Sequence, residues 1–476
     1  MNSEFDRLSG GAQGDLSGPV LDPGFVPLGL FLNDYERRAN ETPSALRCEV
    51  ALEGVPGSVS RWEGRLLPES EPSADTLAFL RHTIKFLLWA RGGATLHIAA
   101  PDVAIRYIRS LLSPEGALAF DAGLMARAFE RPFEVRSCAS EALPSATATG
   151  QSLGGHLEGC RIGFDLGASD YKIAAVKDGV SVFSAEFPWD PVSEPDPAYH
   201  HRRLTEGLKQ AAAHLPRVDA IGGSSAGIIV DNKIMVASLF RAVPAEVFEQ
   251  RVKPLFLRIQ SEWQVPLAVA NDGDVTALAG AMSLKRNGIL GIAMGSSEAV
   301  GYLDPQGHIL GWLNELAFAP LDARPDAPKD EWSGAPGVGA QYFSQQAVSR
   351  LLPAAGIEVP RSMPLPERLL LVQRLAEEGD RRAEQIFETI GTYLGHTLPL
   401  YRRFYSFGDV LVLGRVTSGR GGEILIAAAH CVLQHLYGEA GAPFAVRVPD
   451  EQSRRVGQAV AAASLPPLKR SKGEAP

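Results

Sequence analysis

The sequence lacks most of the features that mark exported, membrane-spanning and disulfide-bonded proteins. Its 476 residues include only four cysteines, Cys48, Cys138, Cys160 and Cys431, and no two of them form a C-x-x-C pair. This spacing argues against a zinc site built on cysteines and fits a reducing compartment. No apolar run reaches the roughly 20 residues of a membrane span. The first residues, M-N-S-E-F-D-R, have neither the basic start nor the apolar core of an export signal, so we expect a cytoplasmic protein with no membrane partner.

An excess of basic residues is also missing. The chain carries 46 Lys and Arg against 55 Asp and Glu, which gives a net charge of −9 at pH 7. Because nucleic-acid phosphates need a basic face, this balance weighs against nucleic acid as a partner. The 45% of hydrophobic and 21% of charged residues are typical of a globular protein, and 476 residues are too many for one ordinary core. We therefore expect two or three domains.

The N-terminal third of the chain has its own predicted elements but no motif with an assignable role. Residues 1–25 are rich in Gly, Ser, Asp and Pro and are predicted to form a disordered tail. Further on, Ala74–Ala90 has helical spacing, A-T-L-H-I-A-A is typical of a buried strand, and D-V-A-I-R-Y-I-R-S-L-L has the spacing of a second helix. These patterns predict a small α/β accessory domain over residues 26–158, without a basic recognition helix.

From Arg161 onward, the order of predicted elements occurs twice. The first set consists of strands at 162–166, 171–176 and 180–187, a helix near Tyr199–His214, a strand ending in G-G-S-S-A-G, a long helix around Ala245–Trp263, and the strand before N-D at 271–272. The second set consists of strands at Gly288–Ala293, Glu298–Leu303 and His308–Trp312, helices from the 340s to 404, the strand Val410–Leu413, a helix, the strand Phe444–Val448 and a final helix. This repetition predicts a duplicated α/β unit with a cleft between the copies.

The predicted domain boundaries follow from this repetition. The first copy is placed at residues 159–270 and the second at 271–450. The C-terminal helix, 451–464, is expected to return to the first copy, and residues 465–476 are expected to form a tail.

Five short motifs lie at the ends of the predicted strands. They are D-L-G-A-S at 165–169, G-G-S-S-A-G at 222–227, N-D at 271–272, I-A-M-G-S-S-E at 292–298 and L-V-L-G-R-V-T-S-G at 411–419. Gly, Asp and Ser are common in any turn, so a single motif of this kind is unspecific. In this order and spacing the five resemble the ROK family (repressors, uncharacterised reading frames and sugar kinases), over roughly Arg161 to Ser464. The resemblance implies an α/β fold of duplicated ribonuclease H-like domains, as in actin-like ATPases, flanking a cleft.

The resemblance also implies that ATP and Mg²⁺ are bound at the glycine-containing turns. A turn without bulky side chains lets backbone N–H groups approach phosphate oxygens, and the Ser169 hydroxyl adds a donor. Asp165 is placed to hold Mg²⁺ through water, since Mg²⁺ keeps several waters and takes few carboxylates. The turn Gly295–Ser297 is expected to bind phosphate from the other copy. The predicted nucleotide-binding residues are Asp165, Gly167, Ala168, Ser169, Lys172, Gly295, Ser296, Ser297, Gly414 and Arg415.

The same resemblance implies that Asp272 accepts the proton of a sugar hydroxyl during phosphoryl transfer. Without its neighbours, Asp272 is explained as the N-cap of the helix that follows. In the same way, Ser224–Gly227 can be an ordinary tight turn and Arg241 an ordinary surface residue. The predicted acceptor-binding residues are Asn271, Glu315, Ser225, Ala226, Gly227 and Arg241.

The sequence departs from the family pattern at the expected sugar and zinc sites. Zinc-containing members carry G-E-x-G-H and then a cysteine cluster, whereas this chain has N-E-L-A-F and then W-S-G-A-P-G-V-G-A-Q-Y-F-S. Phe318 replaces the histidine, and Ala340 stands where a second sugar-binding glutamate is expected. Arg415 and Val416 replace a run of glycines. We therefore expect no zinc, and an acceptor pocket rebuilt for something other than glucose or N-acetylmannosamine.

These observations leave three hypotheses. The first is ATP-dependent phosphorylation of a hydroxyl on a sugar or cyclitol. The second is a non-catalytic regulator that binds sugar or nucleotide, which the retention of Asp165, Asp272 and both phosphate turns disfavours. The third is an ATPase coupled to a partner through the N-terminal region. Family kinases are often dimers, so a homodimer is a further expectation by analogy.

Overall fold

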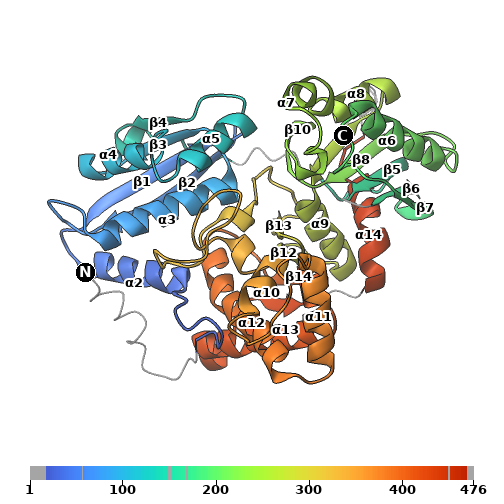
Figure 1. Ribbon diagram of the computed structural model, residues 1–476. Helices are drawn as coiled ribbons and strands as arrows, with labels where there is room; N and C mark the ends of the chain where they lie inside the picture. Colours follow the sequence, from blue (N-terminus) through green and yellow to red (C-terminus); the bar gives the residue numbers. More distant parts are fainter. Residues whose placement is uncertain (1–17, 56, 148–152, 168–169, 449–450, 469–476) are drawn as a thin grey trace. The chain divides into compact units, whose positions relative to one another are not determined.

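The computed structural model describes residues 18–55, 57–147, 153–167, 170–448 and 451–468 (Figure 1). These residues fall into two units. The first unit takes in the described residues of Met1–Ala148, Ile292–Val300 and Trp312–Val448. The second takes in those of Thr149–Gly291, Gly301–Gly311 and Pro449–Pro476. The predicted α/β class is confirmed, and the N-terminal region shares a unit with most of the second predicted copy.

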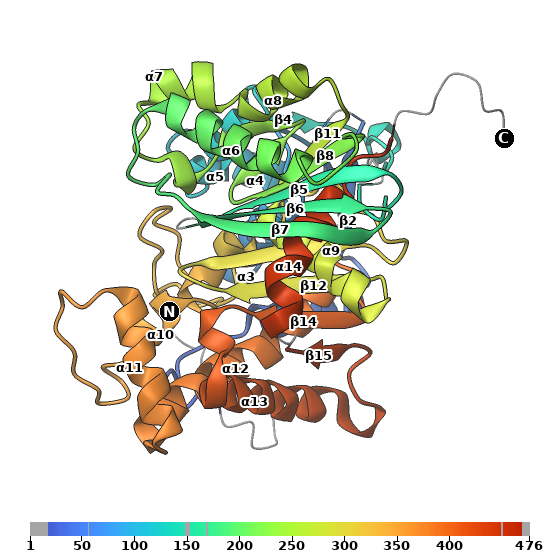
Figure 2. The ribbon, with the colours of Figure 1, turned by 90° about the vertical axis from the view of Figure 1, so that its right-hand side faces the viewer.

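The second unit is built on a five-stranded sheet with helices on both faces. The strand order is β11-β8-β5-β6-β7, in which β5, β8 and β11 run parallel while β6 and β7 run antiparallel to their neighbours. Figure 2 shows α6 and α8 on one face of this sheet and α9 and α14 on the other. The elements are β5 (Cys160–Leu166), β6 (Asp170–Lys177), β7 (Val180–Pro188), α6 (Pro197–Ala212), β8 (Ala220–Ser225), α8 (Leu255–Trp263), β11 (Leu267–Asn271), α9 (Asp272–Leu284) and α14 (Glu451–Ala463).

Two glycines let the C-terminal helix α14 pack directly on the strands of this sheet. A Cβ atom at Gly163 in β5 would lie 1.7 Å from the Ala459 oxygen, and one at Gly222 in β8 would lie 1.7 Å from the Ala462 oxygen. Neither contact is compatible with any side chain, so both positions require glycine. The small residues Ala174 and Ala463 fill the same interface.

We therefore expect Gly222→Ala to destabilise the protein strongly. The methyl group would have to displace the α14 backbone, and overpacking typically costs about 1–3 kcal/mol, occasionally more. Gly123→Ala is the matched control, because a Cβ at Gly123 in helix α5 (Ala119–Ala128) meets nothing within 4 Å and alanine favours the helix. Urea unfolding of the two variants should separate them, and equal unfolding midpoints would contradict this account.

Two features of the second unit differ from the prediction. The single long helix expected at Ala245–Trp263 is divided into α7 (Ala245–Val247), a π-helical turn (Phe248–Val252) and α8. Pro254 precedes α8 and cannot donate a backbone hydrogen bond, which explains the break. The prediction also missed a hairpin, β9 (Ile228–Val230) and β10 (Lys233–Val236).

The third strand predicted for the second copy, at His308–Trp312, is wrong. Within this stretch Ile309 forms only an isolated bridge, to Leu153. The Asp304 side chain accepts hydrogen bonds from the backbone N–H groups of Gln306 and His308, so these groups are used in a local turn. Gly311 has a φ of 66°, which also ends any extended run.

The strands observed in the second predicted copy form a second sheet. Its order is β13-β12-β14-β15, and β14 pairs parallel with β15. Helices α12 and α13 pack closely on each other, since a Cβ at Gly391 would lie 2.2 Å from the Leu425 oxygen. The elements are β12 (Ile289–Met294), β13 (Glu298–Leu303), α10 (Gln345–Leu351), α11 (Leu365–Glu377), α12 (Arg381–Arg402), β14 (Asp409–Leu413), α13 (Gly419–Tyr437) and β15 (Ala445–Arg447).

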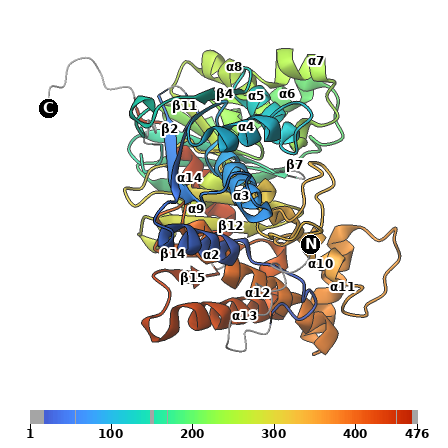
Figure 3. The same cartoon turned by 90° about the vertical axis from the view of Figure 1, so that its left-hand side faces the viewer.

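The N-terminal region forms a four-stranded sheet with its own helices. The strand order is β2-β1-β3-β4, with β3 and β4 parallel and the other pairs antiparallel. Helix α2 lies alongside α3 and also contacts α12 (Figures 1 and 3). The predicted helix at 74–90 is confirmed, whereas α2, α5 and three strands were missed. The elements are α2 (Leu28–Glu41), β1 (Leu46–Glu53), β2 (Val59–Leu66), α3 (Ala74–Arg91), β3 (Thr95–Ala99), α4 (Asp102–Leu111), α5 (Ala119–Ala128) and β4 (Glu134–Ser137).

Part of the predicted N-terminal tail, 1–25, is folded. Residues 1–17 lie outside the described part, but Asp22 is buried and its carboxylate pairs with Arg324 and Arg350. The Tyr393 hydroxyl donates a 2.7 Å hydrogen bond to the same carboxylate. The buried charge is thus paired and hydrogen-bonded, which is the condition for holding it inside a protein.

Candidate functional site

The predicted motifs of the second unit meet at one edge of its sheet. Strands β5, β8 and β11 are parallel neighbours, so their carboxyl ends lie side by side. The register pairs Asp165 with Ser224 and pairs Ser225 with Asn271. Three motifs that are far apart in the sequence are therefore brought together at the carboxyl ends of parallel strands, where ligands commonly bind in open α/β sheets.

Asp165 is a buried carboxylate with a fixed orientation. The Ser224 hydroxyl donates a 2.6 Å hydrogen bond to Oδ1, and the Lys172 Nζ lies 3.7 Å from Oδ2. Burial raises the pKa of Asp165, although the hydrogen bond from Ser224 and the charge of Lys172 act against this. A single oriented carboxylate suits a Mg²⁺ ion that keeps its own water shell.

Asn271 and Asp272 lie at the junction of β11 and α9. The Asn271 Oδ1 accepts a 2.8 Å hydrogen bond from the Gly273 N–H, and its Nδ2 donates a 2.9 Å bond to the Gly227 oxygen. Asn271 is therefore the N-cap of α9, and the alternative interpretation that gave this role to Asp272 is corrected. Asp272 is the first residue of the helix, where a negative charge is favourable.

The electrostatics of Asp272 suit a proton acceptor. Its side chain is partly exposed, and its Oδ1 accepts a 3.0 Å hydrogen bond from the Gly273 N–H. Burial and the negative charge of Asp165 raise the pKa of Asp272 to about 6. A carboxylate with a pKa just below neutral is ionised at pH 7 and still binds a proton well, which is the balance a general base needs.

The remaining predicted residues of this unit have more ordinary surroundings. Gly227 has a φ of 105°, and a Cβ there would lie 2.3 Å from the Val236 oxygen, so a tight turn explains this glycine. Ser225 is buried, Ala226 is half-buried, and Arg241 is exposed at the end of a 3₁₀ turn (Ser238–Phe240). None of these features assigns a ligand contact by itself.

The turn that follows β5 is only partly described. The Gly167 N–H donates a 3.0 Å hydrogen bond to the Asp170 oxygen, and the Trp189 indole N–H donates a 2.8 Å bond to the Gly167 oxygen. The predicted phosphate contacts Ala168 and Ser169 lie outside the described residues.

In the first unit, two further glycine motifs are adjacent. Gly414 at the end of β14 has a φ of 102°, and a Cβ there would lie 2.4 Å from the Met294 oxygen at the end of β12. The turn after β12 is held by bonds from the Gly295 N–H to the Ser297 oxygen and from the Gln345 N–H to the Gly295 oxygen, both 2.9 Å. Ser296 and Arg415 are exposed beside this junction.

A buried carboxylate that the sequence interpretation missed lies near Glu315. Glu298 is 4% exposed, and the Tyr401 hydroxyl donates a 3.0 Å hydrogen bond to its Oε1. Burial raises the pKa of Glu298 to about 8. The hydrogen bond from Tyr401 lowers this pKa, whereas the negative charge of Glu315 raises it. The sequence signal was a glutamate at the start of an otherwise apolar strand.

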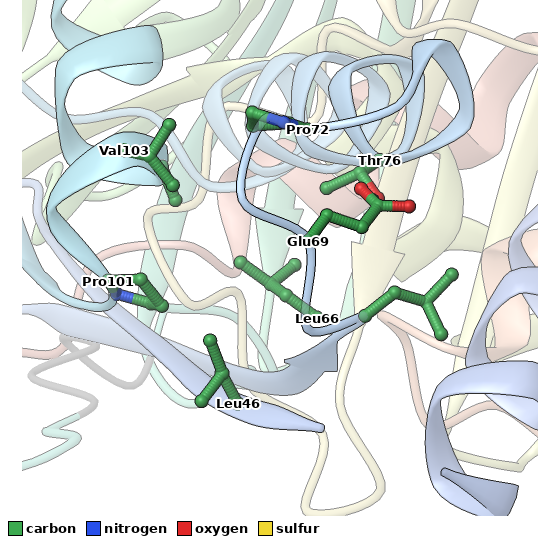
Figure 4. A pocket seen from close by; sticks show the side chains of 9 residues that line it. Leu46, Leu66, Glu69, Pro72, Thr76, Pro101 and Val103 are labelled. Carbon is green, nitrogen blue, oxygen red and sulfur yellow. The ribbon is translucent and has the colours of Figure 1, made fainter. Parts of the chain in front are cut away.

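Neither a cluster of metal ligands nor a polar pocket indicates a second site among the described residues. Among the described residues, no three His, Cys, Asp or Glu side chains gather closely enough to hold a metal ion. A small pocket in the N-terminal region is lined mostly by apolar side chains (Figure 4). Its one carboxylate, Glu69, accepts hydrogen bonds from the Ser73 N–H and the Thr76 hydroxyl, and so stabilises the start of α3.

None of the helices in the described part of the chain has the length and apolar character of a membrane span.

The sheets and helices from β5 onward have the actin-like ATPase fold, and solved structures of this fold match the chain. A ROK hexokinase from Thermus thermophilus matches with a TM-score of 0.50 and 19% identity, covering 64% of this chain and 97% of its own. A ROK glucokinase from Streptomyces griseus, in complex with glucose and AMPPNP, matches with a TM-score of 0.48 and 18% identity, covering 64% and 98%. A ROK transcriptional regulator, a homologue of the E. coli MLC protein, matches with a TM-score of 0.48 and 17% identity, covering 68% and 81%.

No protein-family model matches the chain, and no curated protein matches it in sequence. The likeness to ROK sugar kinases that the five motifs predicted is confirmed for the fold. The sequence identity of 19% shows the fold alone, so activity and substrate are argued from the residues.

Proposed function

We propose that this protein is an ATP-dependent carbohydrate kinase that phosphorylates a hydroxyl of a sugar or cyclitol. The observation that carries the proposal is the arrangement at the edge of the second unit's sheet. There Asp165 is oriented by Ser224, and Asp272, with its pKa near 6, follows the helix cap Asn271. An oriented carboxylate for a hydrated metal and a separate carboxylate for a proton are what phosphoryl transfer to an alcohol requires.

In the proposed reaction, Asp272 accepts the proton as the acceptor oxygen bonds to the γ-phosphorus of ATP. The bond between that phosphorus and the β–γ bridging oxygen breaks, and ADP leaves with the electron pair. Asp165 would hold Mg²⁺ through water, and the ion would offset charge on the phosphates. The turns at 165–169 and 295–297, with Lys172, Gly414 and Arg415, are the proposed nucleotide contacts.

The proposed acceptor contacts are Asn271, Glu315, Arg241 and the backbone of 225–227. No zinc is proposed, because Phe318 stands in place of the family histidine and no cysteine cluster follows it. The cytoplasmic location and the homodimer stay predictions from the sequence.

The test is acceptor-dependent release of ADP. Purified protein with MgATP is incubated with a panel of sugars, amino sugars, sugar acids and cyclitols, and ADP is measured against a reaction without acceptor. We expect at least one member to raise ADP release well above the acceptor-free rate. Sugar binding without ADP release would favour the regulator hypothesis. ADP release that no acceptor stimulates would favour the partner-coupled ATPase.

A further inference from the structure

The N-terminal region holds the loop that carries Glu315. The backbone N–H groups of Leu313, Asn314 and Glu315 donate hydrogen bonds of 3.1, 3.3 and 3.1 Å to the last carbonyl oxygens of α3. Carbonyls at the end of a helix have no partner within the helix, so this loop satisfies them. The Tyr405 hydroxyl donates a further 3.0 Å bond to the Asn314 side chain. The backbone at Glu315 is therefore fixed by a region outside the two predicted kinase domains.

Four aromatic rings meet beside this loop, two from the N-terminal region and two from the segment 312–448 of the first unit. Trp89 of α3 lies 4.7 Å from Phe318, and Trp332 lies 5.0 Å from Phe318 and 5.0 Å from Phe120 of α5, measured between ring centroids. The Trp89 indole N–H donates a 2.5 Å hydrogen bond to the buried Asp121. Trp89 of the N-terminal region thus packs against Phe318, and Phe120 of the same region packs against Trp332.

Trp332 is exposed although its loop is ordered by hydrogen bonds. Its relative exposure is 52%, which is unusual for a tryptophan with two aromatic neighbours. The Asp330 carboxylate accepts 2.7 Å bonds from both the N–H and the hydroxyl of Ser333, and the Asp330 N–H donates a 3.0 Å bond to the Ala335 oxygen. Together with the half-buried rings of Phe120 and Phe318, this exposed indole forms contiguous apolar surface, and contiguous apolar patches are common at binding sites.

A carboxylate lies in the same turn as one of these rings. The Phe318 N–H donates a 3.2 Å hydrogen bond to the Glu315 oxygen, which closes the 3₁₀ turn η4 (Leu316–Phe318). Glu315 is the N-cap of this turn, so its carboxylate and the Phe318 ring start from the two ends of one short turn. Sugars have apolar C–H faces and a rim of hydroxyls, and a site that joins aromatic rings to a carboxylate matches both.

We propose that Trp332, backed by Phe318 and Phe120, stacks on the C–H face of a pyranose whose hydroxyls are bound by Glu315. The N-terminal region then shapes the sugar site through Trp89 and Phe120. The identification of this sugar as the phosphoryl acceptor rests on the proposed kinase function, whereas the stacking itself requires neither ATP nor catalysis.

The test is calorimetric titration of the full chain without nucleotide. The probes are D-galactose, D-mannose, D-xylose and N-acetylglucosamine, with the open-chain polyol sorbitol as the control that lacks a ring face. We expect saturable binding of at least one pyranose and none of sorbitol. Trp332→Ala should weaken that binding about tenfold, the scale of one aromatic contact, and Trp332→Phe should restore most of it. Leu370→Ala is the matched control, since Leu370 is 64% exposed on α11 and belongs to no ring cluster.

Each outcome decides the proposal. Equal affinity of wild type and Trp332→Ala overturns it, as does the absence of saturable binding of all four pyranoses at millimolar concentration. Thermal unfolding of each variant shows whether it is folded, and Trp332→Leu, which keeps apolar bulk but has no ring, repeats the comparison if the alanine variant is not. Failure of the kinase proposal is seen separately: a pyranose that binds through Trp332 but yields no ADP with MgATP leaves the stacking proposal standing.

Discussion

Asp272→Asn is expected to lower kcat by roughly 10²–10⁴-fold, the usual scale for losing a positioned proton acceptor. Asparagine keeps the shape of the side chain but cannot take the hydroxyl proton. The helix should not suffer, because the cap of α9 is Asn271 and stays in place. KM for the acceptor and nucleotide affinity should change little. The comparison is made with the acceptor identified by ADP release, and an unchanged kcat would sink the assignment of Asp272 as the base.

The same variant should be more stable than wild type at neutral pH. The folded state raises the pKa of Asp272 from 3.8 to about 6, so it binds the proton more tightly than the unfolded chain does. Wild-type stability therefore falls as pH rises through this window, by up to about 3 kcal/mol. Asparagine removes that loss, so Asp272→Asn should have the larger free energy of unfolding at pH 7. Below pH 4 the free energies of unfolding of the variant and wild type should be equal.

Two controls accompany this variant. Asp231→Asn makes the same chemical change at an exposed turn residue with a φ of 48°, where asparagine is well tolerated, and it should alter neither kcat nor stability. For wild type, kcat should rise with pH through about 6 as Asp272 ionises. A flat profile between pH 5 and 8 would point to a different group as the base.

The order of elements from β5 onward was largely predictable because buried parallel strands are short apolar runs that end in Gly, Ser, Asn or Asp. The pattern of β8, which ends in G-G-S-S before A-G, is an example, and the structure places Ser224 near the carboxyl end of that strand. Periodicity cannot show where a helix is interrupted by a change of hydrogen bonding, as at Phe248–Val252. It also predicted a strand at His308–Trp312, where the structure has only the isolated bridge at Ile309.

Contacts between residues distant in sequence were beyond prediction. The bond between Ser224 and Asp165 depends on the register of β5 and β8, which no local pattern contains. Tyr401 and Glu298 are 103 residues apart, and only packing brings them together. In the same way, Phe318 was interpreted from sequence as a missing histidine, whereas the structure surrounds it with Trp89 and Trp332.

Glu298 should make the stability of the protein depend on pH. Its carboxyl group is buried, Tyr401 donates to one oxygen, and the other oxygen, Oε2, has no hydrogen-bond partner among the described residues. Gly339 makes room for this oxygen, since a Cβ there would lie 1.9 Å from it. Folding raises the pKa of Glu298 from 4.5 to about 8, so the folded state takes up a proton between these values. Stability contributed by the neutral form is therefore complete below pH 4.5 and is lost as pH rises towards 8.

Glu298→Gln should remove this dependence. Glutamine has nearly the same shape, accepts the Tyr401 hydrogen bond and stays neutral at every pH. We expect the variant to exceed wild type at pH 8.5 by a few kcal/mol, with an upper limit of about 5 kcal/mol, and to match it at pH 4.5. Urea unfolding at both values measures the difference. Glu315→Gln, at a partly exposed neighbour, is the control and should change the pH dependence far less. If Glu298→Gln and wild type lose stability equally between pH 4.5 and 8.5, the carboxyl group of Glu298 is not the group that takes up the proton.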